Sequence, residues 1–229
     1  MKFFKIASAD ITNIPLLQEV AKTKKPVILS TGASNLSEIR RALKILKKNG
    51  SKEIIILHCI LNYPTSDHNA NLDMIKDLKK NFKTHIIGYS DHTLPDKDML
   101  NLTTSFLKGA EVIEKHFTHN KKIKGNDHFH SLDGKDLNNF FKKILQVKNL
   151  SGSSKKKAIP SEKISRLNAR RSIVLNIDVK KNDLITKKNI ITKRPGTGIT
   201  ADNWYKVLGK KFKRNLKSDH ILKWSDIRL

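Results

Sequence analysis

The sequence predicts an α/β domain followed by a small, mostly β domain. From residue 3 to about residue 149, short apolar runs alternate with amphipathic stretches, which is typical of parallel βα units. Beyond residue 171 the apolar runs become shorter and are separated by turn residues. A chain of 229 residues is long enough for one large and one small domain.

Five apolar runs are predicted to be parallel strands. Parallel sheets are covered by helices, so we expect each strand to be buried on both faces. The predicted strands span residues 3–7, 26–31, 54–59, 85–89 and 112–117. Apolar residues at helical spacing predict helices over 35–48, 71–82 and 136–147, and Gly50 ends the first of these.

The chain is predicted to divide into three parts. Residues 1–150 form the α/β domain, and the polar stretch 151–171 lacks apolar periodicity and is predicted to be a linker. Residues 172–229 form the small domain, whose short β candidates cover 172–176, 184–186, 190–193 and 221–224.

Composition excludes several classes of protein. The chain has 46 Lys and Arg against 21 Asp and Glu, a net charge of +25, but the lysines are spread along the sequence. This favours a solvated basic surface over a specific nucleic-acid site, although nonspecific affinity for polyanions is expected. Cys59 is the single cysteine, so an intramolecular disulfide is excluded. No apolar run approaches the roughly 20 residues of a membrane span, and we expect a cytoplasmic protein.

Polar residues follow every predicted strand, where the reactive groups of parallel α/β folds gather. His92 and His116 follow neighbouring strands and could converge on one divalent ion, although a histidine there can also be a structural hydrogen-bonding group. Lys5 could point inward and bind an anion, or lie on the surface of an edge strand. The serines that could join it are Ser8, Ser30 and Ser90.

Several segments together resemble the sialic acid synthase family. They are KIASADITNIPLL, ILSTGAS, LHC followed by YP, GYSDHT, EKHFT, ARRSIV and KRPGTGI. The resemblance implies a TIM (β/α)8 barrel followed by a SAF, or antifreeze-like, domain. A complete barrel takes about 250 residues, so residues 1–150 would be a partial barrel holding about its last five βα units.

The resemblance also implies an activity and a site. The family condenses phosphoenolpyruvate with an N-acylated amino sugar, typically N-acetylmannosamine, to give a sialic-acid-type nonulosonic acid and phosphate. His92 and His116 match its two manganese ligands, with Mg²⁺ or Co²⁺ as alternative ions, and the ion would polarise the aldehyde oxygen of the sugar. The matches to its phosphoenolpyruvate-binding positions are Lys5, Ser8, Ser30 and Ser90, and those to its sugar site are Asp10, Tyr63 and Asp127.

The resemblance further implies a domain-swapped homodimer, because Arg194 matches an arginine that the small domain delivers to the partner subunit. The chain departs from the family at Leu61, where some members have Asn, and at Asn126, where Pro is usual. The family's first three strands have no counterpart. Either another polypeptide supplies them, or this is a truncated form with impaired activity. A non-catalytic polyanion- or carbohydrate-binding fragment is the alternative function.

Overall fold

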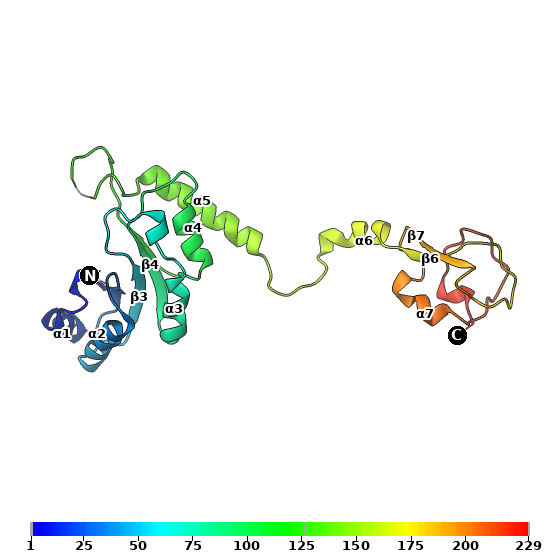
Figure 1. Ribbon diagram of the computed structural model, residues 1–229, viewed down its shortest axis with the longest axis horizontal. Helices are drawn as coiled ribbons and strands as arrows, with labels where there is room; N and C mark the ends of the chain where they lie inside the picture. The colour runs from blue at the N-terminus through cyan, green and yellow to red at the C-terminus, as the bar shows by residue number, and fades with distance from the viewer. Residues whose placement is uncertain (1, 126, 229) are drawn as a thin grey trace. The chain divides into compact units, whose positions relative to one another are not determined.

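The structure is a computed structural model that describes residues 2–125 and 127–228, so Asn126 lies outside the described residues. The chain forms two compact units, Met1–Gly152 and Ser153–Leu229 (Figure 1). No helix of the described part of the chain is long and apolar enough to cross a membrane.

The first unit contains one parallel sheet that curls into half a barrel. Its strands are β1 (Phe4–Ile6), β2 (Val27–Ser30), β3 (Ile54–Cys59), β4 (Ile86–Asp91) and β5 (Ile113–Lys115). They lie side by side in chain order, as successive βα units predict. All five predicted strands are present, and β4 extends two residues further than expected, so that Ser90 and Asp91 remain in the ladder.

Burial of all five strands on both faces was expected, and this is wrong for β1 and β5. These two strands lie at the edges of the sheet, and no residue of β5 is fully buried. In β1 only Ile6 is buried. An edge strand has a neighbour on one side alone, so fewer side chains surround it.

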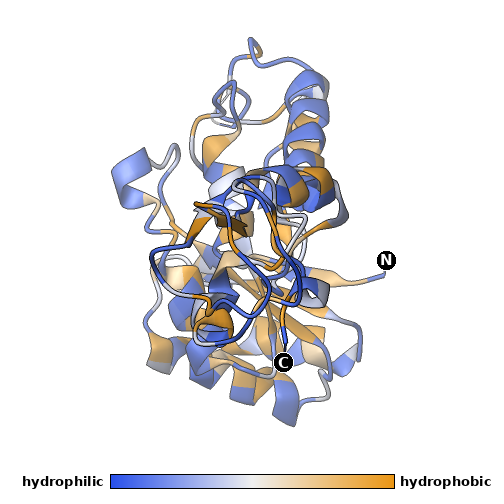
Figure 2. Ribbon diagram, turned by 90° about the vertical axis from the view of Figure 1, so that its right-hand side faces the viewer, coloured by the Kyte–Doolittle hydropathy of each residue, from blue (hydrophilic) through white to orange (hydrophobic). Residues whose placement is uncertain are grey.

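Helices follow the strands and cover the outside of the sheet (Figure 1). They are α1 (Ile14–Lys22), α2 (Leu36–Lys48), α3 (Met74–Asn81), α4 (Leu100–Leu107) and α5 (Gly134–Ser151). Helix α2 begins with a capping box, in which the Asn35 side chain accepts from the Glu38 N–H and the Glu38 carboxylate accepts from the Asn35 N–H. Hydrophilic and hydrophobic residues alternate along the helices of the structure, as Figure 2 shows.

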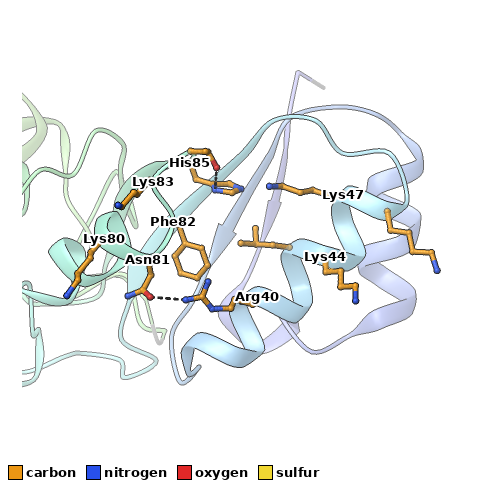
Figure 3. A pocket seen from close by; sticks show the side chains of 11 residues that line it. Arg40, Lys44, Lys47, Lys80, Asn81, Phe82, Lys83 and His85 are labelled. Atoms are coloured by element: carbon orange, nitrogen blue, oxygen red, sulfur yellow. Dashed lines mark hydrogen bonds between the residues drawn. The ribbon is translucent and has the colours of Figure 1, made fainter.

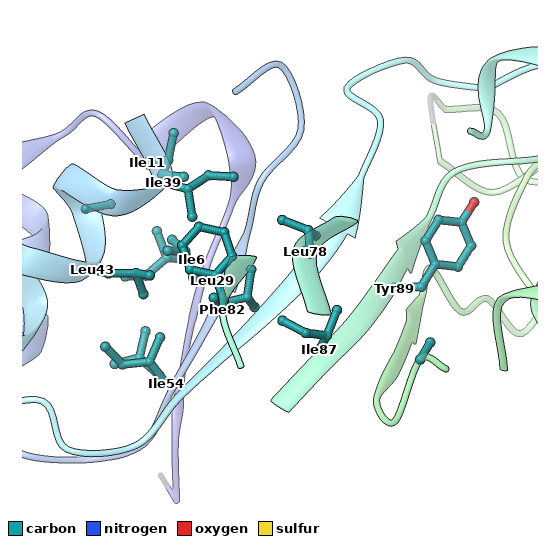
Figure 4. Close-up of a cluster of buried hydrophobic side chains, with 14 of the residues drawn as sticks. Ile6, Ile11, Leu29, Ile39, Leu43, Ile54, Leu78, Phe82, Ile87 and Tyr89 are labelled. Atoms are coloured by element: carbon teal, nitrogen blue, oxygen red, sulfur yellow. The ribbon is translucent and has the colours of Figure 1, made fainter. Parts of the chain in front are cut away.

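The core of the first unit lies between the sheet and these helices. Side chains of α2 and α3 meet those of the strands there, and Phe82 and Tyr89 are two of its aromatic members (Figure 4). Gly88 of β4 lies so close to its neighbours that an added Cβ would be 2.3 Å from the Val112 carbonyl oxygen and 2.5 Å from Leu57 Cδ2. The sheet therefore has no room for a side chain at this position.

The second unit is small and has little regular structure. It contains α6 (Lys163–Ala169), β6 (Ser172–Leu175), β7 (Ile190–Lys193) and α7 (Trp204–Val207), and β6 pairs with β7 in antiparallel orientation. Helix α6 lies inside the segment 151–171 that was expected to be a linker, and the Leu167 carbonyl accepts from the Gly196 N–H at 2.7 Å. This contact attaches the helix to the second unit.

Two of the four β candidates in the second unit are not strands, and the expectation for 184–186 and 221–224 is wrong. Leu184 and Ile221 form only isolated bridges, to Lys211 and Val174. Short apolar runs in a small domain can be buried by irregular backbone, so apolar character alone does not make them strands. The second unit has its own hydrophobic core, whose buried members are Ile173, Leu175, Val179, Ile185, Ile190, Ile199, Val207, Phe212, Leu216, Leu222 and Ile227.

Candidate active site

Two histidines leave the ends of neighbouring strands at the same level. The ladder pairs Asp91 of β4 with Lys115 of β5, so the next residues, His92 and His116, are brought together by the register. Their ring centroids are 5.3 Å apart. This convergence, expected from the strand ends alone, would allow both imidazoles to contact one ion.

The orientation of His92 is set by a backbone carbonyl. Its Nδ1 donates to the Ile60 carbonyl oxygen at 2.7 Å, which leaves Nε2 as the nitrogen with a free lone pair. His92 is buried, and burial lowers the pKa of its imidazole. The neutral form that a metal requires is therefore favoured.

The loop after β5 brings two more polar groups to this pair. The His116 carbonyl accepts from the Leu132 N–H at 2.9 Å, which returns the loop to the end of β5. Asp127 Oδ2 lies 3.6 Å from His116 Nδ1, and Asp127 Oδ1 lies 4.0 Å from His130 Nε2. Ligand atoms of His116, Asp127 and His130 all lie within 4.8 Å of one another.

Tyr63 covers the histidines from the loop after β3. Its ring centroid is 4.1 Å from that of His92 and 6.0 Å from those of both His116 and His130. The ring is half exposed, and its pKa is raised by burial first and then by the neighbouring acidic groups, including Asp127. The hydroxyl therefore stays protonated at neutral pH and can donate a hydrogen bond.

The inner face of the curled sheet, called the lumen below, carries a cluster of polar side chains under the histidines. Lys5 Nζ of β1 is 3.4 Å from Glu114 Oε1 of β5, and Ser90 donates to the same carboxylate oxygen at 2.8 Å. The two edge strands are thus linked across the lumen by one ion pair. Lys5 points inward, as alternation along β1 predicted, and its side chain is 29% exposed.

Cys59 lies in the same lumen. Its Sγ is 3.8 Å from His92 Nδ1 and donates to the Ile60 carbonyl oxygen at 3.7 Å. Burial raises the pKa of the thiol, which keeps it protonated. Ser8 Oγ accepts from the Gly32 N–H at 2.9 Å, which connects the ends of β1 and β2.

A buried ion pair supports the histidines from the outer side of the sheet. Lys115 Nζ lies 2.8 Å from Asp91 Oδ2, and the two side chains are 4% and 2% exposed. Asp91 Oδ1 also accepts from the Thr93 N–H and the Tyr89 hydroxyl, both at 2.9 Å. The residues that precede His92 and His116 are therefore held by one network.

The remaining predicted site residues lie in different environments. Ser30 is buried at the end of β2, and its Oγ has no hydrogen-bond partner among the described residues. Asp10 is partly exposed in the 3-10 turn Ser8–Asp10 that follows β1. Arg194 is exposed in the second unit, before the cis peptide bond to Pro195. Sequence reasoning assigned no role to Glu114 or His130.

The donor set fits a divalent ion. Imidazole nitrogens and a carboxylate are ligands for Mn²⁺, Co²⁺, Zn²⁺ and Fe²⁺. His92 has a free Nε2 fixed by its carbonyl contact, and both ring nitrogens of buried His130 lack partners among the described residues. His92, His116 and Asp127 are the groups that would hold such an ion, and His130 lies beside them.

Comparison with known proteins identifies relatives along the whole chain. The chain is 45% identical over 224 residues to an uncharacterized protein of Methanocaldococcus jannaschii. It is 40% identical over 225 residues to the N,N'-diacetyllegionaminic acid synthase of Campylobacter jejuni. The matches cover 98% and 97% of this chain, but 65% and 66% of the relatives. The chain thus spans less than two thirds of the length of these curated relatives.

Solved structures share the fold. An N-acetylneuraminic acid synthetase from Leptospira borgpetersenii is 36% identical, with a TM-score of 0.64 over 72% of this chain and 56% of that one. A spore coat polysaccharide biosynthesis protein E from Chromobacterium violaceum is 25% identical, with a TM-score of 0.78 over 100% of this chain and 68% of that one. The class of fold that these matches cover in this chain is a curled parallel α/β sheet joined to a small β domain.

Family matches agree with this class. Residues 1–156 match the NeuB family, and residues 170–228 match the SAF domain. The chain belongs to the NeuB family and carries a SAF domain. The resemblance inferred from the sequence motifs is confirmed.

Proposed function

We propose that this chain carries the C-terminal, metal-binding part of a nonulosonic acid synthase, which condenses phosphoenolpyruvate with an N-acylated amino sugar. The observation that carries the proposal is the convergence of His92, His116 and Asp127 above the lumen that holds Lys5 and Ser90. Relatives named as legionaminic and pseudaminic acid synthases support the class of reaction. N-acetylmannosamine or an analogue is the proposed acceptor.

The reaction joins two carbon atoms and releases phosphate. C3 of phosphoenolpyruvate bonds to the aldehyde carbon of the open-chain sugar, and the aldehyde oxygen gains a proton. The oxygen of a water molecule adds at C2, and the C–O bond to phosphate breaks. Negative charge develops on the aldehyde oxygen, so a positive group nearby lowers the barrier.

The residues of the chain divide this work. His92 and His116 would hold a divalent ion, Mn²⁺ in the first place, which supplies positive charge beside the aldehyde oxygen. Lys5 and Ser90 would bind the phosphate or carboxylate of phosphoenolpyruvate in the lumen. Glu114 occupies both of these groups in the structure, so an incoming anion would have to displace it. Tyr63 and Asp127, half exposed above the lumen, would contact the sugar.

Full activity requires the remainder of the barrel and the SAF domain. Within the described part of the chain, strands β1 and β5 each have one unpaired edge, and we propose that further strands of the family fold cover them, in the same or in a separate polypeptide. Arg194 is proposed to reach the active site of a partner subunit in a domain-swapped homodimer. A guanidinium group suits the binding of phosphate or carboxylate.

Phosphate release tests the proposed function. The chain, supplemented with a polypeptide that supplies three preceding βα units of the family, is incubated with phosphoenolpyruvate, N-acetylmannosamine and Mn²⁺. We expect phosphate release that needs the sugar and the metal and that falls at least about a hundredfold in His92→Ala, because a transition-state contact is lost. Sugar-independent release, or an unchanged rate in His92→Ala, would show that the proposal is wrong.

A basic groove favours a second function, the binding of polyanions. This groove of about 780 Å³ lies at the C-terminal ends of α2 and α3, and no acidic residue of the described chain lines it (Figure 3). None of its Lys and Arg side chains lies within 4 Å of a carboxylate of residues 2–125 or 127–228. These side chains are Arg40, Lys44, Lys47, Lys48, Lys80 and Lys83.

The groove also has a structural explanation, because cations at helix C-termini interact favourably with the helix dipole. Binding of a mixed-sequence oligonucleotide at several salt concentrations separates the two functions. Strong, salt-sensitive binding that Lys44→Gln and Lys47→Gln weaken, without sugar-dependent phosphate release, would favour the second function.

A further inference from the structure

His130 is buried without a partner for either ring nitrogen. Its side chain is 0% exposed, and neither Nδ1 nor Nε2 has a hydrogen-bond partner in the described part of the chain. Burying a polar group without a hydrogen bond is unfavourable, so such groups are rare in folded proteins. A buried imidazole of this kind calls for an explanation.

The position of His130 supplies one. Its ring centroid is 5.1 Å from that of His116 and 6.0 Å from that of Tyr63, and the edge contact with Phe129, at 5.0 Å, closes another side. The ring therefore belongs to the same cluster as the histidines at the strand ends. It comes from the loop after β5 and from neither of those strands.

The distances from the Asp127 carboxylate to the ring nitrogens of His116 and His130 are too long for hydrogen bonds. Asp127 lies 3.6 Å from His116 Nδ1 and 4.0 Å from His130 Nε2, beyond the usual 2.7–3.2 Å. Two ligands of one ion, each about 2.1 Å away from it, can be up to about 4.2 Å apart. Both separations from Asp127 fall within that limit, and Asp127 is 58% exposed, so its side chain is free to adjust.

We propose that His130 is a third imidazole ligand of the divalent ion bound at His92 and His116, with Asp127 as a carboxylate ligand. This inference rests on the metal site of the proposed function and extends its ligand set. Three imidazoles and a carboxylate select for Co²⁺ and Zn²⁺ over Mg²⁺, and affinity should rise from Mn²⁺ to Co²⁺. The metal preference of this chain therefore depends on His130.

Titration of the full chain with Co²⁺, followed by visible absorption, tests this ligand set. His130→Leu removes the ligand and keeps an apolar side chain of similar size. We expect the Co²⁺ affinity to fall at least roughly tenfold, because mutating even a residue that only hydrogen-bonds to a ligand costs about 10–100-fold in metal affinity. The visible spectrum of the bound Co²⁺ should also change. His119→Ala, an exposed histidine of the same loop, is the control and should bind Co²⁺ like the wild type.

Thermal denaturation separates a ligand from a purely structural residue. Without metal, His130→Leu should be at least as stable as the wild type, because an unpaired polar ring is replaced by an apolar group. With Co²⁺, the wild type should gain more stability than the variant. His130→Ala is the second variant, and imidazole added to the solution should restore its Co²⁺ binding.

The outcomes distinguish the two proposals. Wild-type affinity and spectrum in His130→Leu, together with weakened binding in His92→Ala and His116→Ala, would overturn the role of His130 and leave the metal site standing. Absence of saturable Co²⁺ binding by the wild-type chain would overturn both.

Discussion

The ion pair between Asp91 and Lys115 illustrates how single residues hold the site. Both side chains are buried, and the carboxylate also accepts from Thr93 and Tyr89. Burial lowers the pKa of Lys115, although the charge of Asp91 acts against this, and burial together with Asp91 raises the pKa of the Tyr89 hydroxyl. Removing one of these groups would therefore leave the others buried without a hydrogen-bond or ionic partner.

Lys115→Met is expected to destabilise the protein by about 3–5 kcal/mol, because it leaves the Asp91 carboxylate buried without its counter-ion. Urea denaturation followed by far-UV circular dichroism measures the change. Adding Asp91→Asn should recover part of the loss, since a neutral amide is buried at lower cost. Lys76→Met, which breaks an exposed pair with Asp73, is the control and should stay within about 1 kcal/mol of the wild type. Equal effects of Lys115→Met and Lys76→Met would contradict this account.

The candidate site was only partly predictable residue by residue. His92 and His116 could be placed together because strand ends and parallel register follow from the apolar runs. His130 could not, because a loop has no periodicity and its position depends on the long-range bond between His116 and Leu132. Three histidines within a short stretch, at positions 119, 128 and 130, were the signal that could have drawn attention to it.

At the scale of elements, β4 depends on the absence of a side chain at Gly88. The strand lies between β3 and β5, and the Val112 carbonyl and the Leu57 side chain occupy the space where a Cβ would be. A backbone carbonyl cannot move without disturbing β5, which carries His116 at its end. Close approach of the strands therefore also positions the histidines.

Gly88→Ala is expected to cost about 1–3 kcal/mol, the usual penalty for overpacking a core. Gly134→Ala is the matched control: this glycine is the first residue of α5, and nothing lies within 4 Å of an added Cβ. It should be neutral or stabilise by about 0.4–1 kcal/mol, because alanine has less freedom in the unfolded chain. Chemical denaturation of both variants measures the difference, and a Gly88→Ala protein as stable as the wild type would show that the strands can separate freely.

Helices α1 and α4 were not predicted from the sequence, although α1 buries Leu17, Val20 and Ala21. Helix α1 has a recognisable start at Asn13 and Pro15, but it was not assigned, and α4 contains two threonines and a weakly amphipathic pattern. In the second unit, Leu184 and Ile221 are apolar and were expected in strands, yet they lie in irregular backbone. Tertiary contacts decide such segments, and local sequence does not reveal those contacts.

At the scale of the whole molecule, unfolding of the second unit can be observed separately by tryptophan fluorescence. Both tryptophans of the chain, Trp204 and Trp224, belong to it. Its buried charge is Asp226, which accepts from Arg214 at 2.7 Å, from His220 at 2.9 Å and from the Lys223 N–H at 3.0 Å. Burial alone would raise the pKa of Asp226, but these partners outweigh it and hold the pKa below its ordinary value.

Asp226→Asn is expected to destabilise the second unit by about 2 kcal/mol at pH 7. A carboxylate whose pKa is lower in the folded state stabilises it fully above the unfolded value of roughly 4, and the contribution is lost as the pH falls through the folded value. The difference between variant and wild type should therefore shrink in acid. Tryptophan fluorescence during urea denaturation at pH 7 and at acid pH measures it.

The control for this prediction is Asp219→Asn. Asp219 forms an exposed pair with Lys193, and its backbone has a φ of 65°, which asparagine also tolerates. The free energy of unfolding should change by no more than about 1 kcal/mol at either pH. A destabilisation by Asp226→Asn that is independent of pH would argue against a lowered pKa.

The thiol of Cys59 has a practical consequence. It lies beside His92 and is the one sulfhydryl of the chain, so a thiol-specific reagent can modify a single position. Because the thiol is buried and protonated, that modification should be slow in the folded protein. The rate of alkylation therefore reports how often local opening at the strand ends exposes this thiol.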